Sequence, residues 1–530
     1  IIGGGSSGIV AASQIISKLN ATVLIIEEGP SDWHPLIKIP AGVINFLEKE
    51  KFVKHYKTIP QKQLNGRIHY ITQASILGGG SSINGMVYMR GRPSDFDEWS
   101  NSTKEKNWSY QSMLPYFKLV EDNNRLFDEN HGIGGDLKVS DSKDTCELTK
   151  IYVKTMQAMG HPYNPDFNSG NQRGVGYMQF TIDQGVRCNA TKAFLSNNKF
   201  KKFLTISTKS KATKIIFKND KAIGVEFYKN KIKNTVFANN EIILTAGSFN
   251  SPKLLMLSGI GNEEELKKHS IEKVFISEGV GQNLQDHHEV SVISKTKPGY
   301  GYFGQDKGLK MLKNIFQYLL FKEGPAATIG CDGCTFLNPD KTIKDYTEEP
   351  SIKLYCVPKV QLDKNVKDIG QFDGITLNSV LMRPKSRGEI KLKSSDPYDM
   401  PLLNPNYLNH EDDKRLQISA FKYSREILNT KPLNDIVINE VFPGEKVKTD
   451  EDILNHCKKS IKTNWHPVGT CKMGTYEDIN AVCDTNLRVK GVRGLRIFDA
   501  SSFPNLVAGN TNAPVIAFAL KAVTELINEY

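Results

Sequence analysis

The chain has 530 residues, of which 39% are hydrophobic and 24% charged, and its formal net charge is +11. This length predicts two or more domains with a large core. No run of about 18 apolar residues occurs, so no membrane span is expected. The lysines are scattered and form no basic stripe with interleaved aromatics, so no nucleic-acid partner is expected. A solvated surface explains the charge best, with an anionic substrate or a membrane surface as weaker alternatives.

The eight cysteines are too few for a disulfide framework in a chain this long. Cys331 and Cys334 form a lone C-x-x-C without a second ligand pair, so neither zinc nor another metal is expected. The numbering begins inside the first expected strand, so targeting cannot be read and a cytoplasmic location is only a default expectation. The oligomeric state stays open.

The first residues have the pattern of a dinucleotide-binding turn. Two isoleucines precede Gly3, Gly5 and Gly8, and an apolar-periodic segment follows, which predicts a strand, a tight turn and a helix. The glycines suit the turn, a backbone close to a pyrophosphate, and tight packing of helix on strand. The helix N-terminus, at Ser6 and Ser7, would offer free N–H groups to the phosphates.

Glu27 ends a second strand expected over residues 22–26. An acid about 20 residues after the glycines is placed to accept a hydrogen bond from a ribose hydroxyl. The glycines alone allow NAD, NADP or FAD, whereas Glu27 fits a free ribose hydroxyl better than a 2′-phosphate.

The rest of the chain shows nucleotide-type signals at both ends and different material between them. Residues 290–458 carry no phosphate-type loop and are expected to form a separate domain that contains a sheet. The predicted elements, in chain order, are a glycine-rich loop at 77–85, a helix at 143–159, strands at 204–207, 214–217, 222–227 and 241–245, a helix at 253–258, strands at 390–394 and 494–499, and a helix at 514–526.

Four stretches of the sequence together resemble the glucose–methanol–choline (GMC) oxidoreductases, which depend on FAD. The first signature reads LGGGSSIN at residues 77–84, and the second reads GSFNSPKLLMLSGIG at residues 247–261. The C-terminal pair reads HPVGTCKMG at residues 466–474 and GNTNAP at residues 509–514. The resemblance extends over nearly the whole chain.

The resemblance implies an α/β fold, α+β overall. A discontinuous, Rossmann-like FAD-binding domain would comprise residues 1–142, 176–289 and 459–530. An interleaved substrate-binding domain, built on an antiparallel sheet and helices, would comprise residues 143–175 and 290–458.

The resemblance also implies which residues contact FAD. The glycine turn would hold the pyrophosphate and Glu27 the adenosine ribose, and the remaining contacts would come from Gly79, Ser82, Asn84, Gly85, Ala212, Ala246, Asp499, Ala500, Asn510, Asn512 and Ala513. Ala74 and Ser75 replace the glycine and basic residue usual before the first signature, so one basic partner of the cofactor is missing. Ile83 stands where some relatives attach the flavin through a histidine, so non-covalent FAD is expected.

The expected reaction is oxidation of a primary alcohol to an aldehyde, with hydride transfer to flavin N5 and oxygen or another electron acceptor. Such chemistry needs a base within reach of the hydroxyl and a second polar group that orients it. By resemblance, His466 is the base and Asn510 its partner, and the substrate cavity is expected to be lined by Ile83, Trp465, Cys331 and Tyr355. No carboxylate–aromatic cage for a quaternary ammonium is evident, so choline is not favoured.

Two alternatives stay open. The segment around Cys331 resembles the fatty acid photodecarboxylases, in which a cysteine and an arginine line the site. Here Cys331 matches, but Tyr355 stands at the arginine position, and His466, which those enzymes lack, is present. Both differences favour alcohol oxidation. The second alternative is a flavin-binding module without catalysis, and the pair His466 and Asn510 argues against it.

Overall fold

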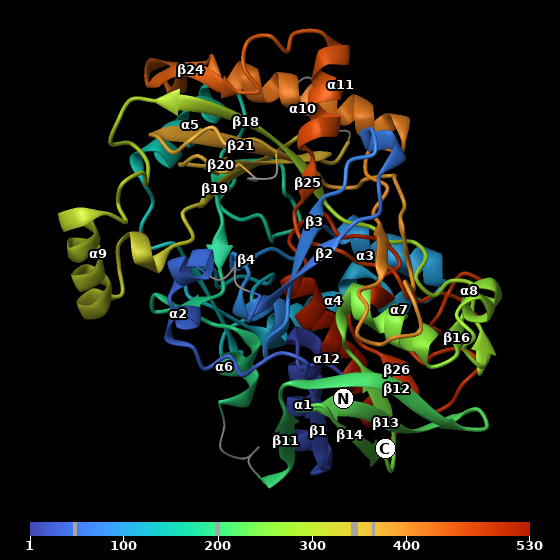
Figure 1. Cartoon of the computed structure of the whole chain (residues 1–530). Helices are drawn as coiled ribbons and strands as arrows, with labels where there is room; N and C mark the ends of the chain where they lie inside the picture. Colours follow the sequence, from blue (N-terminus) through green and yellow to red (C-terminus); the bar gives the residue numbers. More distant parts are fainter. Residues whose placement is uncertain (46–49, 197–201, 341–347, 363–365) are drawn as a thin grey trace.

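The computed structural model describes residues 1–45, 50–196, 202–340, 348–362 and 366–530. The two chain ends lie in the lower part of the molecule as drawn in Figure 1, together with a parallel sheet, and a large antiparallel sheet lies in the upper part. The fold is mixed α/β, as the sequence predicts.

The parallel sheet is built from segments far apart in the sequence. Its order is β11, β1, the bridge residue Ile2, β15 and β26, since Ile2 pairs in parallel with both Ile26 and Leu244. The bounds are β1 (Val23–Ile26), β11 (Leu204–Ser207), β15 (Ile242–Leu244) and β26 (Leu495–Ile497). Each lies inside a predicted strand. The first and last predicted helices are confirmed as α1 (Ser6–Leu19) and α12 (Asn512–Asn528), which pack against each other.

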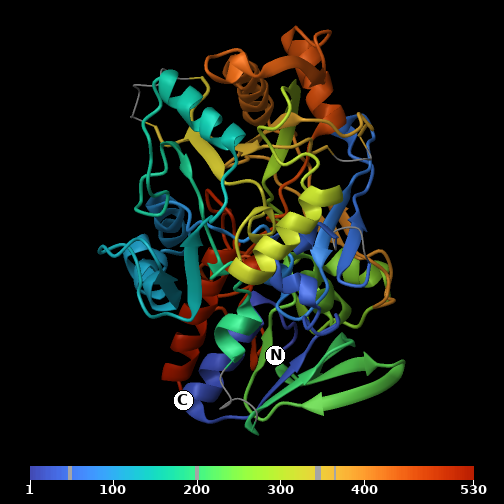
Figure 2. The same cartoon turned by 90° about the vertical axis from the view of Figure 1, so that its left-hand side faces the viewer.

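An antiparallel three-stranded sheet follows β11, and Figure 2 shows it beneath the parallel sheet, near the N-terminus. It comprises β12 (Ser210–Lys218), β13 (Lys221–Lys229) and β14 (Ile232–Phe237). The first two contain predicted strands, but the sequence analysis missed β14, because this edge strand carries few buried side chains to form a pattern. The next helix, α7 (Gly247–Leu257), begins earlier than the predicted residue 253, because the carboxylate of Asp499 accepts hydrogen bonds from Gly247 N and Ser251 Oγ in its first turns.

The large antiparallel sheet has the order β24, β18, β21, β20, β19, β7, and β25 also pairs with β18. Helices α5, α10 and α11 cover it (Figure 1), and α5 lies inside the helix predicted at residues 143–159. The bounds are β7 (Gly174–Tyr177), β18 (His288–Thr296), β19 (Gly333–Leu337), β20 (Ile352–Val357), β21 (Gly374–Leu381), β24 (Val437–Phe442), β25 (Lys462–Thr463), α5 (Glu147–Ala158), α10 (Glu411–Leu428) and α11 (Asp450–Ser460). The proposed domain boundaries themselves stay a prediction.

The remaining elements connect these sheets. The strand predicted at 390–394 is shorter, β22 (Glu389–Lys391), and pairs with β23 (Leu402–Asn404) apart from the large sheet. Others are β2 (Val53–Lys57), β3 (Tyr70–Ala74), α2 (Pro35–Lys38), α3 (Pro93–Thr103), α4 (Tyr110–Val120), α6 (Ala190–Leu195), α8 (Glu263–Lys268) and α9 (Gly308–Phe321). Among the described residues, no helix is both long and apolar enough to cross a membrane. All eight cysteines are free thiols.

Candidate active site

A cavity of about 1320 Å³ is lined by residues of both the parallel and the antiparallel sheet regions. It exceeds the roughly 300–1,000 Å³ usual for one small ligand. The predicted site residues that line it are Gly3, Gly5, Ser6, Ser7, Glu27, Gly79, Ile83, Asn84, Gly85, Ala212, Ala246, Cys331, Tyr355, Trp465, His466, Asp499, Ala500, Asn510 and Asn512. Three predicted residues, Gly8, Ser82 and Ala513, do not line it.

The three glycines of the N-terminal turn have different surroundings. Gly3 has φ +103°, and a Cβ there would stand 2.4 Å from the carbonyl oxygen of Thr245. A Cβ on Gly8 would stand 2.1 Å from the carbonyl oxygen of Gly3. Gly5 lines the cavity, and a Cβ there would meet only Gly79 Cα, at 3.9 Å. Gly3 and Gly8 are therefore required by packing, whereas Gly5 is free to face a ligand.

The N-terminus of α1 opens toward the cavity without a side-chain cap. Its N-cap residue is Gly5, and its first turn carries no acidic residue. First-turn N–H groups without acceptors, at the positive end of the helix dipole, suit a phosphate group. Ser6 Oγ donates to Asn512 Oδ1 over 2.8 Å, which joins this helix start to that of α12. These residues fit the pyrophosphate of a dinucleotide.

Glu27 is held by the backbone on two sides. Its carboxylate accepts hydrogen bonds from Gly4 N and Gly29 N, both at 2.7 Å, which leaves lone pairs on both oxygens for a ribose hydroxyl. Burial raises the pKa of Glu27, and the two backbone hydrogen bonds oppose that rise. The neighbouring Glu28 forms ion pairs with Lys54 and Lys211, which also line the cavity and which the sequence analysis did not single out.

Hydrogen bonds from two side chains, Asn189 and Arg187, fix the glycine-rich loop of residues 77–85. Ser82 Oγ donates to Leu77 O over 2.8 Å and accepts from Asn189 Nδ2 over 2.9 Å, so Ser82 shapes the loop instead of lining the cavity. Arg187 donates to the carbonyl oxygen and the Oδ1 of Asn84, at 2.7 and 2.8 Å. This buried arginine supports the loop, and no sequence motif indicated it.

A buried carboxylate fixes the backbone at His466. Asp286 Oδ1 accepts from His466 N over 2.8 Å, and its Oδ2 accepts from Thr463 Oγ1 over 2.6 Å and from the hydroxyl of Tyr407. Burial raises the pKa of Asp286 to about 6, and these hydrogen bonds oppose the rise. Trp465, with φ +61°, lines the cavity beside His466, as predicted for a wall residue.

The imidazole of His466 stands between two polar side chains. Its Nδ1 lies 2.9 Å from Nδ1 of His287, and its Nε2 lies 3.2 Å from Nδ2 of Asn510. The other ring nitrogen of His287, Nε2, lies 3.0 Å from the carbonyl oxygen of Met382. Burial lowers the pKa of His287 to about 3. Burial, with His287 and Lys353 nearby, also lowers the pKa of His466 well below its ordinary value.

The amide of Asn510 is fixed by two donors. Lys353 Nζ and the hydroxyl of Tyr355 each donate to Asn510 Oδ1 over 3.0 Å. Burial lowers the pKa of Lys353 to about 8, and its ammonium lies 4.2 Å from the centre of the Tyr355 ring. With Oδ1 occupied by two donors, Nδ2 of Asn510 must point to His466. The sequence placed Tyr355 in the cavity but missed Lys353 and His287.

Two further acidic or nucleophilic groups line the cavity. Glu289 is buried and pairs with Lys462 Nζ over 3.0 Å, while its other oxygen accepts from Asn464. Cys331 also lines the cavity, and burial raises the pKa of its thiol, so it stays protonated.

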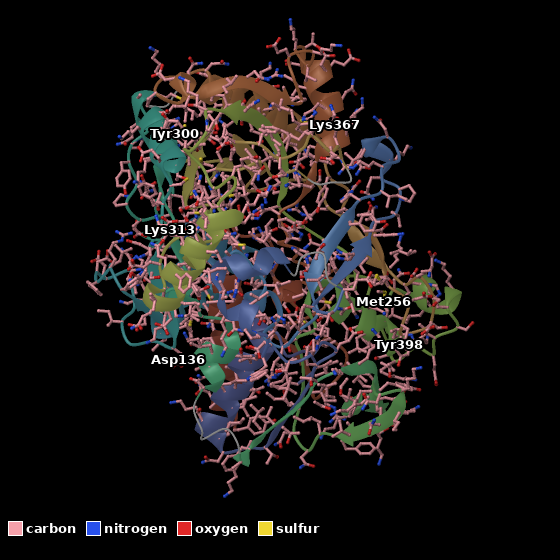
Figure 3. The ribbon with its side chains drawn as sticks, turned by 60° about the vertical axis from the view of Figure 1, so that its left-hand side comes forward. Asp136, Met256, Tyr300, Lys313, Lys367 and Tyr398 are labelled. Carbon is pink, nitrogen blue, oxygen red and sulfur yellow. The ribbon has the colours of Figure 1, made fainter. Side chains whose placement is uncertain are left out.

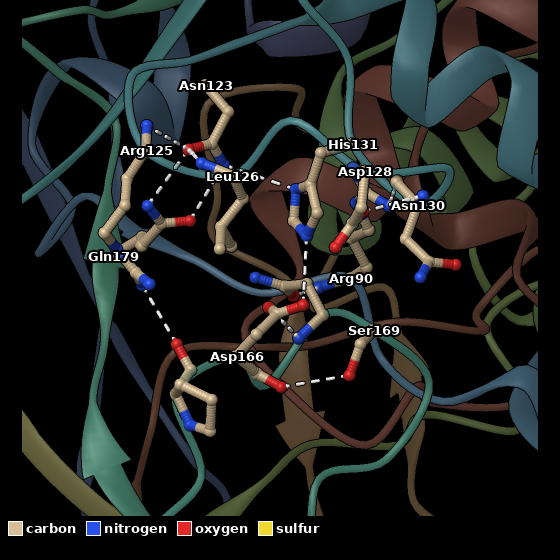
Figure 4. Close-up of polar contacts among 12 residues, drawn as sticks. Arg90, Asn123, Arg125, Leu126, Asp128, Asn130, His131, Asp166, Ser169 and Gln179 are labelled. Carbon is tan, nitrogen blue, oxygen red and sulfur yellow. Dashed lines mark hydrogen bonds and ion pairs between the residues drawn. The ribbon is translucent and has the colours of Figure 1, made fainter.

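Figure 4 shows a separate polar cluster that resembles a metal site in composition but differs from one in the protonation of its histidine. Asp128, His131 and Asp166 place possible ligand atoms together. However, the two ring nitrogens of His131 lie 3.0 Å from Glu121 and from Asp166. Burial would lower the pKa of His131, but these two hydrogen bonds outweigh it and raise the pKa to about 9. A doubly protonated imidazole has no lone pair for a metal, so the cluster is a buried ion-pair network.

Comparison with known proteins gives a consistent family. The GMC oxidoreductase family models match residues 1–289 and 384–519. The chain is 36% identical to an alcohol dehydrogenase [acceptor] of Pseudomonas putida, over 100% of this chain and 95% of that protein. It is also 36% identical to an oxygen-dependent choline dehydrogenase of Brucella anthropi, over 99% of this chain and 95% of that protein.

Solved structures agree. Pyridoxine 4-oxidase from Mesorbium loti superposes with a TM-score of 0.90 at 27% identity, covering 100% of this chain and 99% of that one. The uncapped start of α1, Glu27 and the glycine-rich loop of residues 77–85 fit FAD, the cofactor of this family. The chain therefore belongs to the GMC oxidoreductases, FAD-dependent enzymes that act on CH–OH donors.

Proposed function

We propose that this chain oxidises a primary alcohol to an aldehyde, with His466 as the base that takes the hydroxyl proton. The observation that carries the proposal is the hydrogen-bond chain from Met382 through His287 to His466, which ends at Asn510 in the cavity.

The protons of this series of hydrogen bonds can be assigned by starting at the carbonyl oxygen of Met382. A carbonyl oxygen only accepts, so Nε2 of His287 carries the proton that it donates to Met382 O. Because its lowered pKa keeps His287 neutral, its Nδ1 has a lone pair. Nδ1 of His466 must then be the donor between the two rings, which leaves the lone pair of His466 on Nε2, toward Asn510 and the cavity.

This arrangement suits proton removal from an alcohol. The hydroxyl would displace Nδ2 of Asn510 from Nε2 of His466 and donate to that nitrogen, and the freed Nδ2 of Asn510 would donate to the alcohol oxygen and orient it. Bound FAD would supply the hydride acceptor, flavin N5, for the same carbon, so that the substrate would lose one proton to His466 and one hydride and become an aldehyde. Oxygen or another acceptor then takes the two electrons.

The residues that would hold FAD are the cavity residues of the glycine turn, the loop of residues 77–85 and the segment at Asp499. The α1 N-terminus would take the pyrophosphate, Glu27 the adenosine ribose, and the segments near Gly79 and Asp499 the flavin side. Ile83 lines the cavity where a linking histidine would have to stand, which supports non-covalent binding.

The favoured substrate is an uncharged, apolar alcohol. The lining of the cavity includes the apolar side chains of Ile83, Ile329, Val357 and Trp465. The buried carboxylate of Glu289, which could otherwise attract a cationic alcohol such as choline, is already paired with Lys462.

The test is anaerobic mixing of the FAD-loaded enzyme with a panel of primary alcohols. Wild type should bleach the absorption band of oxidised flavin, and His466→Ala should slow this step by about 10²–10⁴ while keeping FAD. His410→Asn, at an exposed helix N-cap away from the cavity, is the matched control and should behave as wild type. A His466→Ala enzyme as fast as wild type would remove His466 from this role. Alkane formed from a long-chain acid under blue light would favour photodecarboxylation instead.

A further inference from the structure

The helix α9 presents large apolar side chains to the outside of the molecule. Tyr318 is its buried residue, whereas Leu309, Phe316 and Leu320 are 84%, 63% and 70% exposed. Figures 1 and 2 show α9 on the outer surface, away from the helices that cover the large sheet. So much exposed apolar surface on one short element indicates an interaction site.

The exposed apolar residues of α9 lie mostly on one broad side of the helix. At 100° per residue, one stripe about 100° wide contains Leu309, Leu312, Phe316, Leu319 and Leu320. Met311 and Ile315 lie beside this stripe, are 39% and 44% exposed, and line the cavity. The cavity accounts for these two residues, whereas no residue of the outer stripe lines it.

Positive charge accompanies the outer stripe. Lys313 lies at its border and Lys310 further round on the same side, and Figure 3 labels Lys313 on this helix. Lys307 and Lys322 stand at the two ends, next to Asp306 and Glu323 respectively, and residues 308–321 include no Asp or Glu. An apolar stripe bordered by lysines is the pattern of a helix that lies in a membrane interface.

We propose that α9 docks the protein on an anionic lipid bilayer, with the outer stripe inserted among the acyl chains and the lysines at the phosphate headgroups. The helix is 14 residues long, about 21 Å, which suits lying in the interface and is too short to span the bilayer. A second copy of the chain is a poorer partner, because an isologous contact would bring two lysine-bordered helices of a chain with net charge +11 together.

Docking in this orientation sets the wall of the cavity against the lipid. Met311 and Ile315 line the cavity from the same helix. Alcohols that partition into lipid would then be concentrated beside the cavity. This consequence for the substrate rests on the proposed function, whereas the docking does not.

The experiment is flotation of the FAD-loaded protein with phosphatidylcholine vesicles, with and without about 30% phosphatidylglycerol. Wild type should float with the anionic vesicles, less so at high salt. The variant Leu312→Glu/Phe316→Glu should bind at least about tenfold more weakly, and Lys310→Gln/Lys313→Gln should lose the preference for phosphatidylglycerol. The matched control, Ile232→Glu/Phe237→Glu, changes two apolar residues of β14 that are at least as exposed as Leu312 and Phe316, and it should bind like wild type.

Three results would overturn the proposal: no flotation of wild type, equal flotation of the Leu312/Phe316 variant, or a lipid-free dimer that this variant abolishes. Because none of these residues lines the cavity, the variants should oxidise a water-soluble alcohol as wild type does. Normal turnover with lost flotation keeps the docking separate from the proposed function, and flotation can be measured even if no alcohol is turned over.

Discussion

Two parts of the cavity lining are built in different ways. At the glycine turn, backbone atoms make the site: the uncapped start of α1, the φ of Gly3, and the N–H groups that hold Glu27. At His466, side chains make the site, and they come from segments far apart in the sequence, including His287, Lys353 and Asn510.

This difference decides how each part responds to change. Backbone geometry is set by local packing, so a substitution there alters the fold or the cofactor affinity. A chain of side-chain hydrogen bonds sets proton positions, so a substitution there should alter the rate and its pH dependence while the fold and FAD persist.

The largest effect is expected at Gly3. Gly3→Ala forces a side chain into φ +103° and against the carbonyl of Thr245, and we expect a loss of roughly 2–6 kcal/mol in the free energy of unfolding. Gly5→Ala is the matched variant. Its Cβ would lie 3.9 Å from Cα of Gly79, an ordinary contact distance, so the apoprotein should stay folded while FAD affinity falls about tenfold or more. Denaturant unfolding of the apoproteins and FAD titration separate the two. Equal stability losses for both would contradict the distinct roles of the two glycines.

A smaller effect is expected at His287. In His287→Phe, the acceptor that holds Nδ1–H of His466 is lost, so the tautomer and ring position are no longer fixed, and flavin reduction should slow by about 10–100-fold. Rapid anaerobic reduction of the FAD-loaded fraction measures this.

His288→Phe serves as the control for that variant, since His288 is also buried and is adjacent in sequence. It should keep the wild-type rate. If the two variants slow reduction equally, His287 acts only through the local packing of β18.

The smallest effect concerns Lys353. Burial and the nearby charge of Lys353 hold the pKa of His466 below its usual value, so wild-type reduction should be independent of pH down through about 6.5 and fall only at lower pH. Lys353→Met removes this charge, so protonation of His466 should begin at higher pH, with the acid limb shifted upward by about 1 unit. The pH profile of flavin reduction measures the shift. Lys353→Gln, which keeps a donor for Asn510 without the charge, should show the same shift with a smaller loss of rate.

The same contrast explains what the sequence could predict. The turn, α1, β1 and Glu27 follow one another within 27 residues, so periodicity and spacing define them, and the structure confirms these elements. The late start assigned to α7 has a physical cause, because the Asp499 carboxylate that holds its first turns lies far along the chain.

The proposed catalytic residues could be predicted only where a motif marked them. His466 and Asn510 stand in the two C-terminal signatures, and the structure brings them to 3.2 Å. Neither His287 nor Lys353 belongs to a signature that the sequence marked as part of the site. Their contacts with His466 and Asn510 arise from the pairing of β18, β20, β21 and β25, which no local pattern reveals.

The proposed role of His466 requires that the hydrogen-bond chain leave its Nε2 unprotonated toward the cavity. Nitrogen-15 NMR of the histidine-labelled FAD enzyme near neutral pH reports the protonation of each ring nitrogen, with His466→Ala used to assign the signals. We predict a protonated Nδ1 and an unprotonated Nε2 for His466. A proton on Nε2, in either the neutral tautomer or the imidazolium, would contradict the account.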